Sequence, residues 1–271
     1  MLKKLLLLCI LSFNFSTYSQ SREVKIISWN IRDFGKTKNS EELDKIADIV
    51  RDTDILAIQE VVSGYGGAQA VARLADALNR KGSKWDYVIS NPTNSSKYVT
   101  ERYAFIWKTK YIKIKNRGFL VKELDEKVER EPFLLDFYVN GDKFTVLNFH
   151  SRPYNKDPET EIKEISKYIL DRFTSPILFV GDFNVNDKNK AFTNLKDKGY
   201  KTAVVNKKTT LKKKCYRGQY VNYAIDNIYY SKKIKKVDSK VLDFIKNCTN
   251  LETGRYLSDH LPVYMKFSIV K

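Results

Sequence analysis

Short apolar segments of strand length alternate with amphipathic segments of helical length along most of this 271-residue chain. Lys25–Asn30 and Ile55–Val61 are apolar and partly β-branched, which is typical of buried strands. Between them, the apolar residues of 41–51 recur at helical spacing, and Ser40 stands where a helix cap is expected. Because the chain switches repeatedly between these two periodicities, it predicts a mixed α/β fold.

The rest of the chain continues this alternation. Asn140 and Gly141 separate two expected strands by a two-residue turn, which indicates a β-hairpin. Because some strands are joined by helices and others by hairpins, we expect an α/β (α+β) sandwich of two packed mixed β-sheets flanked by helices. Further helices are expected over 68–80, 162–173 and 191–198, and further strands over 87–90, 103–107, 111–115, 133–139, 144–150, 176–184, 223–230, 240–244 and 263–270.

The first 19 residues have the order of a secretory signal peptide. Lys3 and Lys4 precede an apolar run from Leu5 to Phe13, and small residues precede an expected cleavage after Ser19. The run is too short for a membrane span, which needs about 20 apolar residues. The residues around Cys9 are not those of a lipidation site. We therefore expect no membrane anchor and secretion to an extracellular or periplasmic space.

Residues 20–271 contain no Pro/Gly/Ser-rich linker and no internal repeat, so we expect one domain over this range. Without the signal peptide, Cys215 and Cys248 are the remaining cysteines. In an oxidising compartment they can pair and close a long loop. The alternative is two buried free thiols, and the sequence leaves both open because it does not give their separation.

The chain is strongly basic, with a formal net charge of +17, and loss of Lys3 and Lys4 with the signal leaves +15. A field of this size attracts polyanions such as nucleic acid or an anionic membrane surface. A single lysine cluster is also typical of a solvated loop, so the clusters favour a polyanionic partner only together. They lie at Lys207–Lys208, Lys212–Lys214, Lys232–Lys233 and Lys235–Lys236.

Polar residues gather where the expected strands end. Carboxylates, amides and imidazoles without a cluster of thiols favour a hard cation such as Mg²⁺, Mn²⁺ or Ca²⁺ over structural zinc. Taken singly, an aspartate or asparagine is also typical of a turn. The residues at these ends are Asn30, Glu60, His150, Asp182, Asn184, Asp226, Asp259 and His260.

His150 and His260 are the two histidines of the chain, and each adjoins an expected strand among other polar residues. A single histidine is often structural. Any imidazole chemistry near neutral pH must nevertheless involve these two, because no other imidazole is present. They are therefore our candidates for acid and base catalysis.

Eight short motifs that combine these polar residues with their neighbours follow one another along the chain. They are Ser28–Gly35, Gln59–Val61, Glu101–Phe105, Arg130–Pro132, Asn148–His150, Gly181–Asn184, Ala224–Ile228 and Ser258–Val263. One motif alone is weakly specific, but the joint occurrence of all of them in order is specific. Through them the chain resembles the endonuclease/exonuclease/phosphatase superfamily and, within it, the deoxyribonuclease I family. The resemblance implies a four-layered α/β sandwich and metal-dependent endonucleolytic hydrolysis of DNA phosphodiester bonds.

The resemblance also implies a metal site and contacts to DNA. Glu60 matches the family's metal-binding glutamate, with Asn30 and Asp259 beside the ion. The ion is expected to be Mg²⁺ or Mn²⁺, with or without Ca²⁺. Arg32 and Arg130 match positions that contact the DNA backbone.

The same resemblance implies the catalytic groups. His150, supported by Glu101, matches one catalytic histidine, and a carboxylate in that position makes an imidazole more basic and fixes its tautomer. We expect His260 to act as the base, while shared or reversed roles of the two histidines stay open. The remaining matches are Asp226, which supports His260, and Asp182 and Asn184, which orient the phosphate or the attacking water.

Two departures from the family bear on DNA binding. Val62 stands where vertebrate members that probe the minor groove carry arginine, and Val99 replaces their tyrosine, although Tyr98 is adjacent and is the candidate DNA contact. Lysine clusters can supply phosphate contacts instead, which carry little sequence information. We therefore expect a monomer that acts on extracellular double-stranded DNA with weak sequence preference and steep salt dependence.

Two other classes of function compete with this interpretation. Related phosphoesterases that act on abasic-site DNA, sphingomyelin or inositol phosphates use similar groups on one fold. Glu101–Tyr103 and Arg130–Pro132 favour the deoxyribonuclease branch, and the signal peptide argues against intracellular repair. A non-catalytic DNA-binding protein is the second alternative, but such a protein needs neither metal carboxylates nor paired histidines at one site.

Overall fold

The computed structural model describes residues 22–270. The expected signal peptide over residues 1–19 lies outside the described residues. Within the described part of the chain, no helix combines the length and the apolar character that a membrane span requires.

Six strands form the first β-sheet, in the order β14-β15-β1-β2-β4-β3. β1 runs parallel to β2 and antiparallel to β15, so the sheet is mixed. The strands are β1 (Val24–Phe34), β2 (Ile55–Val62), β3 (Trp85–Ile89), β4 (Glu101–Lys108), β14 (Ile234–Val241) and β15 (Val263–Ile269).

Seven strands form the second sheet, in the order β10-β13-β9-β8-β7-β5, with β6 also paired to β7. β8 and β9 are parallel, and β7 and β13 flank them in the antiparallel sense. The strands are β5 (Ile112–Ile114), β6 (Phe119–Leu120), β7 (Phe133–Val139), β8 (Asp142–His150), β9 (Ile177–Asp182), β10 (Lys201–Thr202) and β13 (Asp226–Tyr230).

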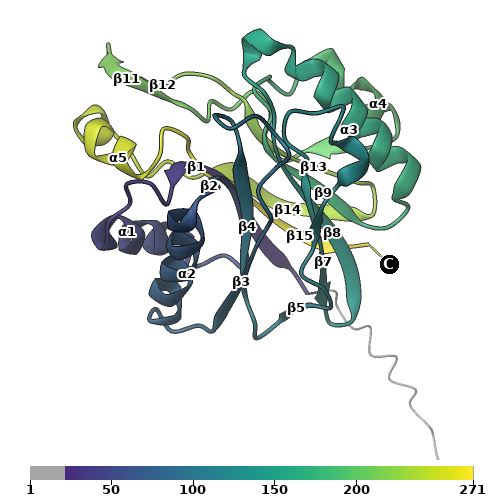
Figure 1. Cartoon of the computed structure of the whole chain (residues 1–271), viewed down its shortest axis with the longest axis horizontal. Coiled ribbons are helices and arrows are strands. Elements are labelled where there is room, and N and C mark those ends of the chain that lie inside the picture. Colours follow the sequence, from purple (N-terminus) through teal and green to yellow (C-terminus); the bar gives the residue numbers. More distant parts are fainter. Residues whose placement is uncertain (1–21, 271) are drawn as a thin grey trace, which may run out of the picture.

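Helices cover the outer face of each sheet (Figure 1). α1 (Ser40–Val50) and α2 (Tyr65–Asn79) share a buried apolar cluster with the first sheet. α3 (Pro158–Arg172) and α4 (Thr193–Asp197) share another with the second sheet. The shorter helices are α5 (Leu251–Leu257), η1 (Lys122–Leu124), η2 (Tyr154–Lys156), η3 (Lys190–Phe192) and η4 (Cys248–Asn250).

The largest buried cluster lies between the two sheets. Phe105 of the first sheet contacts Phe133 and Phe137 of the second, with ring centroids 5.4 Å apart in both pairs. Because burial of apolar area is the main favourable term in folding, these inner faces hold the sheets together. The expected sandwich of two mixed sheets between helical layers is confirmed.

The cap of α1 differs from the expectation. Asn39, and not Ser40, is the N-cap residue, and its side chain accepts a 2.9 Å hydrogen bond from the backbone N–H of Glu42. The Glu42 carboxylate accepts the backbone N–H of Asn39 at 2.9 Å, which completes a capping box. Ser40 is therefore the first helical residue, because Asn39 together with Glu42 satisfies two helix-end donors that Ser40 would leave free.

The β7–β8 hairpin has the expected turn. Asn140 has φ of +51° and Gly141 has φ of +87°. A two-residue hairpin turn of type I′ requires positive φ at both positions, which asparagine and glycine tolerate best. This prediction is confirmed.

Two regions in the last third of the chain were predicted incorrectly. The strand expected over 240–244 is β14, which covers Ile234–Val241. Half of its residues are charged and most are exposed, because it lies at a sheet edge. A lysine-rich segment expected as loop forms a separate hairpin of β11 (Leu211–Tyr216) and β12 (Gln219–Val221). A disulfide joins this hairpin to η4 through Cys215 and Cys248, whose Cα atoms lie 5.7 Å apart.

Candidate active site

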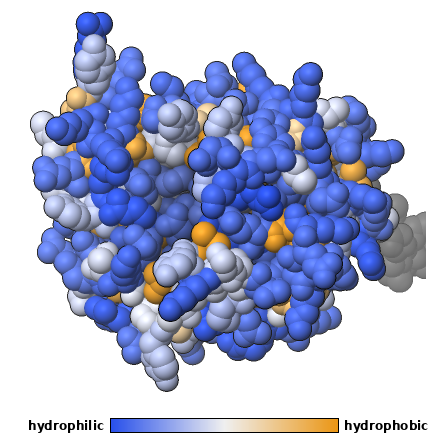
Figure 2. Space-filling model, turned by 45° about the horizontal axis from the view of Figure 1, so that its top comes forward, coloured by the Kyte–Doolittle hydropathy of each residue, from blue (hydrophilic) through white to orange (hydrophobic). Residues whose placement is uncertain are grey.

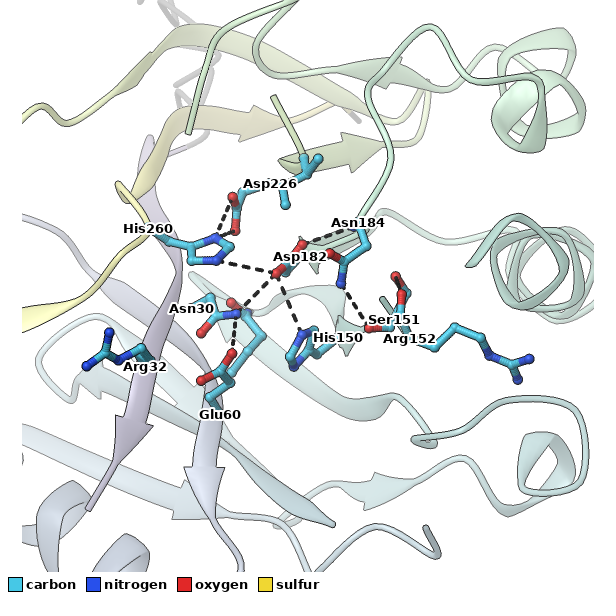
Figure 3. A network of polar contacts seen from close by, with 12 residues as sticks. Asn30, Arg32, Glu60, His150, Ser151, Arg152, Asp182, Asn184, Asp226 and His260 are labelled. Atoms are coloured by element: carbon cyan, nitrogen blue, oxygen red, sulfur yellow. Dashed lines mark hydrogen bonds and ion pairs between the residues drawn. The ribbon is translucent and has the colours of Figure 1, made fainter. Parts of the chain in front are cut away.

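The polar residues at the strand ends lie together at one edge of the two packed sheets (Figure 3). The parallel strands β8 and β9 end there, where His150 pairs in register with Asp182. β13 runs antiparallel to β9, so its first residue, Asp226, pairs with Asp182 as well. Asn30 of β1 reaches the same place and donates from Nδ2 to Asp182 Oδ2 at 3.1 Å. Residues from distant parts of the chain therefore meet in one constellation.

His150 is held by a buried carboxylate. Its Nδ1 lies 2.9 and 3.1 Å from the two oxygens of Glu101. The Arg130 guanidinium lies 3.3 Å from the same carboxylate and donates to the carbonyl oxygens of Val99 and Ser151. Because Nδ1 faces Glu101, Nε2 is the imidazole atom left to face the site.

His260 has a matching arrangement on the opposite side. Its Nδ1 lies 2.9 and 3.1 Å from the oxygens of Asp226. The buried hydroxyl of Thr209 donates to Asp226 Oδ2 at 2.6 Å. A carboxylate that accepts from both neighbours has little rotational freedom, so the imidazole it holds is oriented as well.

Asp182 lies between the two imidazoles. Its Oδ2 is 3.6 Å from His150 Nε2 and 3.8 Å from His260 Nε2. Its Oδ1 accepts the backbone N–H of Asn184 at 3.0 Å, and the Asn184 amide donates to the carbonyl of Ser151 at 3.1 Å. These contacts place Asp182 and Asn184 within the same site as both histidines.

Burial and neighbouring charges together set the pKa values of the site residues. Burial opposes charge on His260, but the Asp226 and Asp182 carboxylates outweigh it and raise the pKa of His260 to about 10. Glu101 likewise outweighs burial and raises the pKa of His150. Burial, together with the Asp226 charge, raises the pKa of Asp182. A raised pKa favours the protonated form of each histidine, which donates a proton and does not accept one. The assignment of His260 as the base therefore stays a prediction.

The Asn30 amide and the Glu60 carboxylate offer oxygen ligands. Asn30 Nδ2 donates to Glu60 Oε1 at 2.9 Å and to Asp182 at 3.1 Å, which fixes Oδ1 as the remaining acceptor. That oxygen is buried, and within residues 22–270 it has no hydrogen-bond partner. A buried acceptor without a partner is costly unless a cation or water satisfies it. The pair therefore fits a hard divalent cation.

Local backbone irregularity directs Glu60 toward Asn30. The pairing of β2 with β4 changes register between Ile58 and Val61, and Glu60 has φ of +60°. A bulge re-aims a side chain, and a positive φ on a residue other than glycine is a strained conformation that concentrates at functional sites.

A second group of possible ligands lies nearby. Donor atoms of Asp182, Asp226 and His260 lie within 4.8 Å of one another. The Asp226 oxygens accept hydrogen bonds from Thr209 and His260. The Glu60 oxygens likewise accept from Asn30 and from the backbone N–H of Asp33. Glu60 with Asn30 is the better fit because Asn30 Oδ1 has no partner within residues 22–270.

Asp259 faces two arginines. Its Oδ2 lies 3.9 Å from Arg32 Nη1 and 3.6 Å from Arg255 Nη2. Asp259 therefore lies beside the site, where its carboxylate faces the two arginine side chains and not Glu60. Its expected role as a metal ligand stays a prediction.

The three expected DNA contacts differ in exposure. The Arg32 side chain is 44% exposed and Tyr98 is 92% exposed, so both are accessible to a substrate. The Arg130 side chain is only 7% exposed and is committed to Glu101. Arg130 and Tyr98 border a cleft of about 340 Å³ that also reaches Glu60 and His150.

Two contributors to the site were not assigned from the sequence. Thr209 gave no signal, because a hairpin separates it from Asp226. Ser258 belongs to a motif but received no role. Its hydroxyl donates to the carbonyl of Asn30 at 2.6 Å and accepts the backbone N–H of His260 at 3.0 Å. It therefore ties the metal side of the site to the histidine side.

Proteins of known activity resemble this chain. Deoxyribonuclease-1 from Bos taurus is 30% identical over 181 residues, which are 60% of this chain and 61% of the bovine protein. The chain thus spans about three fifths of that relative. A deoxyribonuclease from Thioalkalivibrio sp. (strain K90mix) is 25% identical over 267 residues, which are 90% of this chain and 71% of that protein.

Solved structures share the fold. An endonuclease/exonuclease/phosphatase family protein from Bacteroides thetaiotaomicron has a TM-score of 0.68 at 16% identity and covers 93% of this chain and 100% of its own. A mannosyl-6-phosphatase from the same organism has a TM-score of 0.67 at 16% identity and covers 91% of this chain and 100% of its own. At such identities the likeness establishes the fold alone.

The family-level match covers nearly all of the described chain. The sequence model of the Endonuclease/Exonuclease/phosphatase family matches residues 27–260, a span that includes Asn30 at one end and His260 at the other. With the deoxyribonuclease relatives, it bears out the resemblance seen in the motifs. The chain belongs to the endonuclease/exonuclease/phosphatase family of hydrolases.

Proposed function

We propose that this protein is a secreted, metal-dependent endonuclease that hydrolyses DNA phosphodiester bonds with low sequence specificity. One observation carries the proposal. The Asp182 carboxylate lies 3.6 and 3.8 Å from the Nε2 atoms of two histidines, each backed by its own carboxylate. Acid and base groups on both sides of a single point are what in-line displacement at phosphorus requires.

The chemistry has to overcome the negative charge of a phosphodiester. A divalent cation held by Glu60 and Asn30 would neutralise charge that develops on the phosphate and leaving-group oxygens. The buried Asn30 Oδ1 and the adjacent carboxylate are the groups that fit such an ion.

The two histidines divide the proton transfers. Glu101 and Asp226 hold the Nδ1 atoms, so each imidazole exchanges protons through Nε2. One histidine takes a proton from the attacking water, and the other gives a proton to the departing sugar oxygen. Asp182 positions the water or phosphate between them.

DNA as the substrate is supported by three observations. The relatives in the comparisons include deoxyribonucleases. The net charge of +17 favours a polyanion. The face seen in Figure 2 is predominantly hydrophilic, with apolar residues only in small scattered patches, which suits a polar polymer better than a lipid.

Secretion and a monomeric state complete the proposal. Secretion rests on the signal-like order of residues 1–19 and agrees with the Cys215–Cys248 disulfide, since such bonds persist in oxidising compartments. A role in degrading extracellular DNA follows. Fractionation of the native host would contradict it by finding the protein confined to the cytoplasm.

The decisive experiment is cleavage of supercoiled plasmid by residues 20–271 with Mg²⁺, with Mn²⁺, with Mg²⁺ plus Ca²⁺, and with chelator. We expect nicking that needs a divalent ion and falls at least 1000-fold in His150→Ala and in His260→Ala, roughly the size of losing one catalytic group. Sphingomyelin, inositol phosphates and abasic-site DNA are tested separately as alternative substrates. A folded protein that leaves plasmid intact under every ion would overturn the nuclease assignment.

A further inference from the structure

The β11–β12 hairpin projects from the body beside α5, at the upper left of Figure 1. The segment from Lys207 to Ala224 carries six basic residues and no acidic one. Lys213 and Lys214 on β11 and Arg217 at the tip are exposed. We call this hairpin the basic arm.

A groove lies between the basic arm and α5. Its volume is about 530 Å³, and Lys213 and Lys214 line one side of it while Arg255 of α5 lines the other. Arg32 also lines the groove, which therefore extends to the edge of the candidate active site. Glu252 is the acidic residue among four basic ones, so the groove has a net positive charge.

The basic arm is fixed at its base and along its length. The Cys215–Cys248 disulfide joins it to η4, and Arg255 donates to the carbonyl oxygens of Leu211 and Lys212 at 3.0 and 3.2 Å. The Tyr220 hydroxyl donates to Asp243 at 2.5 Å. Because these contacts order the arm before binding, a ligand in the groove would not have to supply the free energy of ordering it.

The arm is also continuous with the catalytic loop. The backbone N–H of Leu211 donates to the carbonyl of Asp259 at 2.7 Å, and that of Leu261 donates to the carbonyl of Thr209 at 2.6 Å. These bonds flank His260. The basic arm therefore begins directly beside His260, so a polymer bound at the histidines has the groove next to it.

We propose that the basic arm and α5 form a binding groove for the phosphate backbone of DNA at a distance from the scissile bond. This inference rests on the proposed function, because it takes DNA as the polymer being cut. Lysines act as point charges on phosphate oxygens and read no base sequence. The groove thus sets affinity for long DNA and its salt dependence, while the reacting atoms are handled by the histidines and the metal ligands.

The test compares two lysine pairs of equal charge. K213Q/K214Q removes the pair in the groove. K232Q/K233Q removes an exposed pair after β13, at the end of the sheet opposite to Asp182, since Ser231 bonds to Ile177 at the start of β9. For a 30-base-pair duplex we expect KM to rise about fivefold in K213Q/K214Q, with kcat unchanged within twofold, and less than a twofold change of either in K232Q/K233Q.

Two further readouts separate binding from chemistry. In chelator, anisotropy of the fluorescein-labelled duplex should show a slope of log affinity against log salt that is shallower by about 2 in K213Q/K214Q, or roughly 0.9 per lost phosphate contact. The ratio of kcat/KM for the duplex to that for bis(4-nitrophenyl) phosphate should fall about fivefold in the same variant, because the small diester is too short to extend from the reacting atoms into the groove.

Each contrary outcome has one meaning. Equal affinity and salt slope in both double variants would overturn the groove. Parallel losses on the duplex and on the small diester would overturn it too, since they indicate a general structural effect. Loss of binding to anionic phosphatidylserine vesicles, with duplex binding intact, would assign the arm to membranes instead. A parent protein that hydrolyses the small diester but no DNA refutes the proposed function, and duplex binding in chelator then decides the groove separately.

Discussion

The hydroxyl of Thr209 donates a 2.6 Å hydrogen bond to Oδ2 of Asp226, and its oxygen accepts the backbone N–H of Asp226 at 3.1 Å. The carboxylate held in this way orients the His260 imidazole through Nδ1. Thr209 precedes the basic arm and Asp226 follows it. The root of the arm is thus linked to a catalytic candidate by a chain of two hydrogen bonds.

Thr209→Val should lower kcat by roughly 10- to 100-fold, because hydrogen bonds to a carboxylate that supports a catalytic histidine have effects of that size. KM should stay within about twofold, because Thr209 is buried and does not reach substrate. Thr209→Ser keeps the hydroxyl and should restore most of kcat. Steady-state kinetics on plasmid or duplex measure both. Equal activity in the valine and serine variants would remove Thr209 from the site.

Substitutions of Arg32 and Arg130 should have different effects, although both residues match family positions that contact the DNA backbone. Arg130→Met leaves the buried Glu101 carboxylate without its arginine, and we expect the free energy of unfolding to fall by about 3 kcal/mol. Arg32→Met removes a side chain that is 44% exposed, so stability should hardly change while KM for DNA rises. Urea unfolding and kinetics at two salt concentrations test this. If Arg130→Met is as stable as the parent and has a raised KM, the result would instead support a direct contact between Arg130 and DNA.

Mn²⁺ should raise the melting temperature of the parent protein, because a ligand that binds only the folded state stabilises it by mass action. Glu60→Ala and Asn30→Ala should each reduce that rise strongly, since they remove the oxygens that fit the ion. His150→Ala serves as the control and should keep the rise while losing activity. An unchanged rise in Glu60→Ala would place the ion elsewhere, with Asp182, Asp226 and His260 as the next candidates.

Loss of the disulfide should destabilise the protein. Cys215 and Cys248 are 33 residues apart, and closing a loop of this length in the unfolded chain corresponds to about 3 to 4 kcal/mol. Cys215→Ser/Cys248→Ser should therefore unfold at lower urea concentration, and a reducing agent should weaken the parent but not the double variant. If reduction leaves the unfolding midpoint of the parent unchanged, the bond is absent or without effect in solution.

Tyr200 should make stability fall at alkaline pH. Burial raises the pKa of Tyr200 from 10.0 to about 12, so the folded state favours the neutral phenol. Its stabilising effect is complete below pH 10 and is lost as pH rises through about 12. At pH 11 the loss is on the order of 1 kcal/mol. Tyr200→Phe should therefore show a smaller drop in unfolding free energy between pH 8 and pH 11 than the parent, with Tyr98→Phe as the exposed control. Identical drops in parent and Tyr200→Phe would contradict the buried phenol.

Much of the fold followed from local patterns. The period-2 and helical repeats predicted most strands and the main helices, because the residues that alternate in sequence are those that face the core. The turn between β7 and β8 was also predicted from local sequence, because asparagine and glycine tolerate positive φ by their own backbone freedom. The edge strand β14 was misplaced because an exposed strand needs no apolar periodicity.

Residue types and their order along the chain specify which chemical groups the site can use. The chain has two histidines, and its motifs put them with carboxylates at strand ends. Three relationships arise only on folding: Arg130 is buried against Glu101, Thr209 holds Asp226, and a run of lysines forms a hairpin beside the candidate active site. These relationships depend on contacts between residues far apart in the chain, and such contacts leave no periodicity or local spacing in the sequence.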